Sequence, residues 1–167
     1  MSMNADKFRR LRSAALNDEN PMVKAFNDHG VSAKKNTNIA TQRSHGDVLL
    51  TIDSTPRSVE SQVATYANFS YALHKVKEYV GPGLPEHAYV MLGCKREQNS
   101  KEMFYLFCQA VALHRYIKDN STSLLSPDQK YYIIPPGNLA DLPGDIGIGD
   151  NIQTAVKDFL DSLVMTR

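Results

Sequence analysis

The chain of 167 residues has no tryptophan, only two cysteines and no long apolar run. A membrane-spanning helix needs about 18–20 consecutive apolar residues, whereas the longest apolar-rich stretch, residues 103–117, is interrupted by Gln109, His114 and Arg115. Where the apolar core of a signal peptide would stand, the chain has basic residues: Lys7, Arg9, Arg10 and Arg12. These absences predict a cytoplasmic protein that does not enter a membrane.

Chemistry-bearing motifs are also scarce. Cys94 and Cys108 are too few for a zinc knuckle or a disulfide framework, and Cys108, inside an apolar run, is predicted to be a buried thiol. No two of the five histidines have the i, i+4 spacing of a helical metal site. No serine stands in a G-x-S-x-G elbow. The sequence therefore predicts no metal, no cofactor and no catalytic residue, and it favours a protein that is not an enzyme.

Charge is distributed unevenly along the chain. Residues 1–45 hold eight Lys and Arg against four Asp and Glu, a net charge of +4, whereas residues 46–167 hold 11 against 14, a net charge of −3. A basic leader on a mildly acidic body suggests two parts with different contacts. We therefore expect a basic, polar N-terminal arm over residues 1–45 and one globular domain over residues 46–167.

Within the arm, two helical segments precede a polar stretch. An apolar stripe at helical spacing favours a helix over residues 4–16, and residues 22–28 favour a second helical turn that stops at Gly30. Residues 31–46 have too few apolar side chains to order themselves, so they are predicted to form either a tether or a segment that orders only on a partner.

The body alternates between apolar runs and amphipathic segments. Three strands are predicted at residues 47–52, 88–94 and 131–134, and three helices at residues 54–80, 99–118 and 150–164. The last helix has a predicted capping box of Asp150 and Gln153. This order predicts an α/β fold: a small three-stranded, mostly parallel sheet (β-α-β-α-β-α) with a helix-dominated core and a helical or extended N-terminal arm. The alternatives are an α+β fold or a mainly α fold.

Two kinds of side chain in the arm are candidates for partner contacts. Apolar residues suited to a groove on a partner, or on the body itself, are Phe8, Leu11 and Phe26. Basic residues suited to steering or to phosphate contacts are Arg9, Arg10, Arg12, Lys34, Lys35 and Arg43. Further hydrogen bonds to phosphate or sugar are expected from Asn36, Asn38, Thr41 and Gln42.

These residues favour an interaction or assembly protein whose arm docks on a protein partner or on a neighbouring copy in a homo-oligomer. The first alternative is a nucleic-acid-associated shell or nucleoprotein-like subunit. The second is a small nucleotide- or metal-binding enzyme that uses the glycine-rich loop Gly144–Asp150 beside His87 or His114. Against the second, the loop carries Asp145 and Asp150 and no basic residue.

Overall fold

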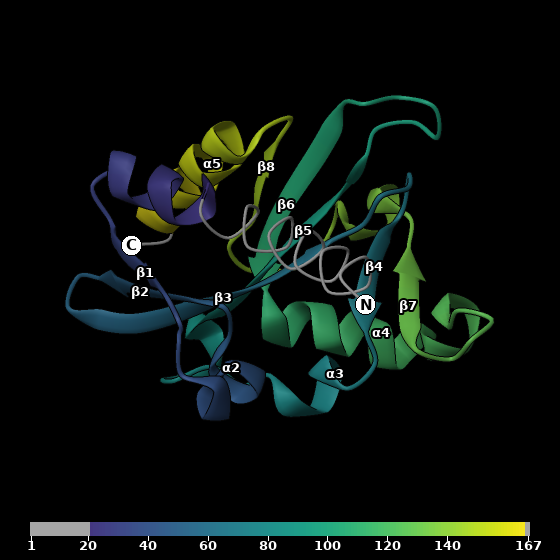
Figure 1. Ribbon diagram of the computed structural model, residues 1–167, viewed down its shortest axis with the longest axis horizontal. Coiled ribbons are helices and arrows are strands. Elements are labelled where there is room, and N and C mark those ends of the chain that lie inside the picture. The colour runs from purple at the N-terminus through teal and green to yellow at the C-terminus, as the bar shows by residue number, and fades with distance from the viewer. Residues whose placement is uncertain (1–20, 166–167) are drawn as a thin grey trace, which may run out of the picture.

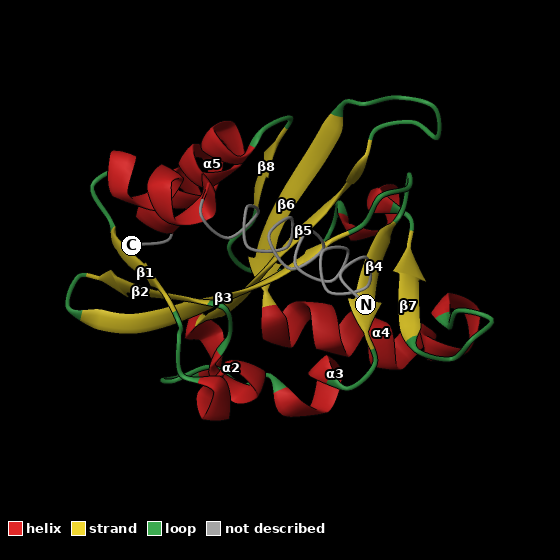
Figure 2. Ribbon diagram, in the orientation of Figure 1, coloured by secondary structure: helices red, strands yellow, loops and turns green. Residues whose placement is uncertain are grey.

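The computed structural model describes residues 21–165, and a mixed β-sheet runs through its centre (Figures 1 and 2). A helix occupies residues 21–28. The later elements are β1 (Ser32–Lys35), α2 (Ile39–His45), β2 (Val48–Ile52), β3 (Thr55–Val63), β4 (Phe69–Ala72), α3 (Lys75–Glu78), η1 (Pro85–His87), β5 (Ala88–Lys95), β6 (Met103–Gln109), α4 (Ala110–Leu124), β7 (Tyr131–Ile134), η2 (Pro136–Leu139), β8 (Gly147–Gly149) and α5 (Ile152–Met165).

Six strands form the main sheet in the order β1-β2-β3-β5-β6-β8, and β4 pairs with β7 in a separate two-stranded sheet. Only the β3–β5 pair of the described sheet is parallel; the other neighbours are antiparallel. The connection between β3 and β5 contains β4, α3 and η1. Consecutive antiparallel strands need only short turns, which explains how most of the sheet forms from neighbouring segments.

The predicted fold class is therefore wrong: the sheet has six strands and mixed pairing instead of three mostly parallel strands, and it lies at the centre of the core. The predicted helix 54–80 is β3, β4 and the short α3, and the predicted helix 99–118 begins as β6. Residues 31–46, predicted to be a tether, contain β1 and α2. Backbone pairing with β2 orders β1, so this segment needs little apolar burial of its own.

Other predictions are confirmed. The strands expected at 47–52 and 88–94 are β2 and β5, and the strand expected at 131–134 is β7, although β7 pairs with β4 outside the main sheet. Residues 22–28 are helical, and the last helix is α5. The predicted capping box of Asp150 and Gln153 is wrong by one residue. The capping residue of α5 is Asn151, whose Oδ1 accepts a hydrogen bond from the amide of Thr154 at 2.8 Å.

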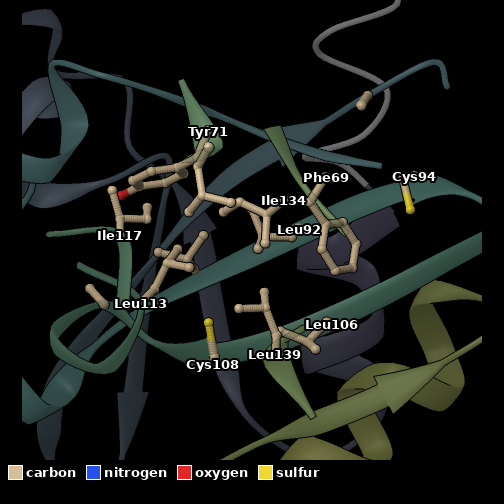
Figure 3. Packing of buried hydrophobic residues seen from close by; sticks show 14 of the residues in the cluster. Phe69, Tyr71, Leu92, Cys94, Leu106, Cys108, Leu113, Ile117, Ile134 and Leu139 are labelled. Atoms are coloured by element: carbon tan, nitrogen blue, oxygen red, sulfur yellow. The ribbon is translucent and has the colours of Figure 1, made fainter. Parts of the chain in front are cut away.

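Two apolar cores cover the two faces of the main sheet. On one face, the helix of residues 21–28 and α5 pack through Phe26 and Phe159 onto Phe107 of β6. On the other, α4 and the β4–β7 pair close a second core, seen in Figure 3, which includes Tyr71 of β4, Leu113 of α4 and Leu92 of β5. Seven of the eight residues of β5 are buried, as expected for a strand covered on both faces.

Candidate functional site

The apolar residues predicted to contact a partner do not form an exposed patch in the described structure. Phe8 and Leu11 lie outside the described residues, as do Arg9, Arg10 and Arg12. Phe26 is fully buried, with its ring centroid 5.8 Å from that of Phe107 and 6.3 Å from that of Phe159. Phe26 thus docks on the body of its own chain, and partner docking by Phe8 and Leu11 stays a prediction.

Two of the predicted basic residues, Lys34 and Lys35, in contrast, line a cleft. Lys34 and Lys35 end β1, and Arg43 belongs to α2, the helix that follows. A cleft of about 380 Å³ lies between these two elements. Its lining residues are Lys34, Lys35, Asn36, Thr37, Asn38, Thr41, His45 and Leu49. Two lysines and no carboxylate are among these residues.

A side-chain network holds the turn between β1 and α2. Asn36 is only 5% exposed; its Nδ2 donates to the carbonyl of Gly46 at 3.0 Å, and its Oδ1 accepts from the amide of Asn38 at 3.1 Å. Asn38 in turn caps α2 by accepting from the amide of Ala40 at 3.0 Å. Gln42 donates to the carbonyl of Asn36 at 2.6 Å. These hydrogen bonds hold the turn between β1 and α2 in place, so this side of the cleft is preorganised for a ligand.

Lys34 and Lys35 are the last two residues of the edge strand β1, and both line the cleft. Consecutive side chains of a strand point to opposite faces, and Lys34 is exposed whereas Lys35 is half-buried. The residues that follow, 36–38, line the same cleft. β1 is an outer strand of the sheet, and lysines on such strands also oppose edge-to-edge pairing.

Sequence reasoning found part of this cleft. It named Lys34, Lys35, Asn36, Asn38 and Thr41 for phosphate or sugar contacts, and all five line the cleft. It missed Thr37, His45 and Leu49, because a predicted tether gave no reason to expect α2 or β2 beside it. Asn36 and Gln42 hold the turn together, so they are positioning residues instead of free hydrogen-bonding groups.

The glycine-rich loop has a different role. A Cβ atom at Gly147 would lie 2.4 Å from the backbone nitrogen of Phe159, and one at Gly149 would lie 2.4 Å from that of Ala155. The amide of Ile148 donates to Asp158 Oδ2 at 2.9 Å. These glycines let β8 approach α5 closely, and packing alone explains them.

The two histidines proposed beside that loop, His87 and His114, have different surroundings. Asp145 lies near His87, but Asp145 is buried and accepts hydrogen bonds from Tyr89 and Gln109 at 3.5 and 3.4 Å. His114 bonds to the hydroxyl of Tyr71 at 2.8 Å, and burial lowers its pKa to about 4. His114 is thus a half-buried residue whose ring is hydrogen-bonded to Tyr71.

One buried charged cluster was not found by sequence reasoning. Lys75 Nζ of α3 lies 3.0 Å from Glu60 Oε1 of β3, and Glu60 is 2% exposed. Burial, followed by the nearby carboxylate of Asp47, raises the pKa of Glu60 to about 8, although Lys75 opposes the shift. The predicted helix over 54–80 gave no reason to expect strand β3, which brings Glu60 near Asp47. This cluster lines none of the pockets described here and joins α3 to the sheet.

A metal cluster and a membrane-spanning helix are both absent from residues 21–165. Within this range no group of three or more His, Cys, Asp or Glu side chains is arranged to hold a metal ion, and no helix is long and apolar enough to cross a membrane. Cys94 and Cys108 are free and buried. Burial raises the pKa of the Cys108 thiol to about 12, in line with the predicted buried thiol.

Comparison with known proteins does not assign the chain to a family. No protein-family model, curated protein or solved structure matches it. Function is therefore argued from the cleft.

Proposed function

We propose that the protein binds the phosphate backbone of nucleic acid in the cleft between β1 and α2. The observation that carries this proposal is the composition of the cleft: two lysines, a histidine and hydrogen-bonding side chains, with no carboxylate in the lining. Contacts of lysine with phosphate are the main source of sequence-independent affinity for nucleic acid.

The lining also argues for the backbone over the bases. Sequence-tolerant binding of bases uses large aromatic side chains on which the bases stack, and the lining of the cleft has no Phe, Tyr or Trp. Hydroxyl and amide groups, as in Thr37 and Asn38, contact phosphate and sugar. The protein would thus bind with little dependence on sequence, and the net charge of +4 over residues 1–45 would add long-range attraction.

Fluorescence anisotropy with labelled oligonucleotides tests the proposal. The double variant Lys34→Gln/Lys35→Gln is compared with the wild type on single-stranded DNA, single-stranded RNA and duplex DNA over a range of salt concentrations. We expect affinity to fall about tenfold or more at low salt. The slope of log K against log salt should become shallower by about 1.4 on single strands, since each lost phosphate contact contributes about 0.7.

A matched control separates the cleft from net charge. The variant Lys101→Gln/Lys130→Gln removes the same charge from exposed residues on the β5–β6 loop and just before β7, away from α2 (Figure 1). It should bind nearly as the wild type does. Equal losses in the two double variants, or no salt-dependent binding by the wild type, would overturn the proposal.

A further inference from the structure

A second pocket, of about 360 Å³, lies along the first half of α4, and it has both charge signs. Its lining residues on α4 and at its N-terminal boundary are Gln109, Val111, Ala112, Arg115, Tyr116 and Asp119. The facing wall consists of Asn138, Asp141, Leu142 and Pro143. The volume lies within the range of small-molecule sites, which combine apolar walls with a few polar groups.

The charged groups of this pocket have no partner among residues 21–165. No hydrogen bond or ion pair there involves the side chains of Arg115, Asp119 or Asp141. Arg115 and Asp119 are four residues apart, a spacing at which opposite charges on a helix commonly pair. Among residues 21–165, neither side chain is paired with a protein group, so both can contact a ligand.

The order of groups along α4 sets the ligand chemistry. Val111 and Tyr116 give the wall an apolar surface, Arg115 provides a guanidinium, and Asp119 lies about 6 Å farther along the axis, at 1.5 Å per residue. Asp141 adds a second carboxylate from the facing wall. An arginine pairs well with a carboxylate in two-pronged geometry, and two aspartates attract an ammonium group.

We propose that this pocket binds a small zwitterion whose carboxylate contacts Arg115 and whose ammonium group lies near Asp119 and Asp141. An ω-amino acid or a dipeptide has charges with about this separation, and its carbon chain would contact Val111 and Tyr116. This site shares no residue with the cleft between β1 and α2 and does not depend on nucleic-acid binding.

Isothermal titration calorimetry on the full chain tests the site with γ-aminobutyrate and glycylglycine, and with butyrate and butylamine as their single-charge counterparts. We expect a Kd of about 1 mM or lower for at least one zwitterion, at least about tenfold tighter than for either counterpart. Arg115→Gln, and separately Asp119→Asn/Asp141→Asn, should weaken that binding about tenfold.

Lys118→Gln, an exposed residue of α4 outside the pocket, is the matched control and should bind as the wild type does. Circular dichroism melting checks that every variant is folded. Equal affinity for butyrate and the zwitterions, equal effects of Arg115→Gln and Lys118→Gln, or no heat from any probe at about 10 mM would overturn the proposal. Lys34→Gln/Lys35→Gln should leave zwitterion binding unchanged, so failure of one site does not imply failure of the other.

Discussion

The pairing of Glu60 with Lys75 shows how a single buried carboxyl couples folding to pH. Lys75 and Gln62 both donate to Glu60 Oε1, whereas Oε2 has no hydrogen-bond partner within the described residues. A buried carboxylate with an unpaired oxygen is costly to ionise. This cost explains why the pKa of Glu60 rises despite a lysine at 3.0 Å.

Glu60→Gln should remove part of the pH dependence of stability. With a pKa of about 8, Glu60 keeps its proton in the folded state between pH 4.5 and pH 8, where the unfolded chain loses it. Its contribution to stability is therefore complete below pH 4.5 and is lost as pH rises through about 8. Glutamine keeps the acceptor oxygen without ionising. Between pH 5 and pH 9, the unfolding free energy of Glu60→Gln should fall less than that of the wild type, by on the order of 2 kcal/mol. Urea denaturation at each pH measures this difference.

The control for this prediction is Glu102→Gln, an exposed carboxyl on the β5–β6 loop, which should follow the wild-type profile. His114 has the opposite slope: its pKa is lowered to about 4, so its contribution is present above pH 6.5 and is lost as pH falls toward 4. Glu60→Gln should leave this acid side unchanged. Parallel profiles for Glu60→Gln and the wild type across pH 5–9 would contradict the assignment.

At the scale of elements, the close approach of β8 and α5 depends on Gly147. A Cβ atom there would lie 2.4 Å from the backbone nitrogen and the Cβ of Phe159, so the strand or the helix would have to move. Gly147→Ala should therefore lower the unfolding free energy by about 2–3 kcal/mol, as overpacking does elsewhere. Chemical denaturation measures the loss.

Gly137→Ala is the matched control, since a Cβ atom at Gly137 meets nothing within 4 Å. Equal stability of the two variants would show that β8 and α5 separate at little cost.

The sequence predicted an element correctly where its apolar residues recur with a period that fits only one kind of secondary structure. In α5, Ala155, Val156 and Phe159 recur at helical spacing, and all are buried. In β3, Val59 and Val63 are four residues apart, a spacing that fits a helix face and also alternate positions of a strand. Pairing with β2 and β5 decides in favour of the strand, and those partners lie up to 30 residues away in the sequence.

For the cleft, the sequence predicted the chemistry of the residues but not their arrangement. The composition of residues 34–41 was sufficient to predict phosphate contacts, because lysines and amides keep their chemistry in any fold. Their arrangement was not predictable, since it depends on the pairing of β1 with β2 and on the burial of Asn36. Glu60 gave no signal at all: an isolated glutamate is most often exposed, and only the sheet and α3 bury this one.

At the scale of the whole molecule, residues 21–165 form two cores that share one sheet, and this sharing should make their unfolding a single event. Tyr89 and Met91 of β5 face the core under α5, and Val90 and Leu92 of the same strand face the core closed by α4. Neither core can lose its sheet face without exposing the other. A cavity in either core should therefore destabilise the entire described structure.

Leu113→Ala and Phe159→Ala, one in each core, test this coupling. Both side chains are buried, and we expect losses of about 2–5 and 3–5 kcal/mol in the free energy of unfolding. Urea denaturation followed by far-ultraviolet circular dichroism and by tyrosine fluorescence should give one transition, with coincident midpoints for the two probes in each variant. Two transitions, or different midpoints for the two probes in either variant, would show instead that the two cores unfold separately. Coincidence is expected because β5 and β6 contribute side chains to both, so the loss of either core removes the support of the other.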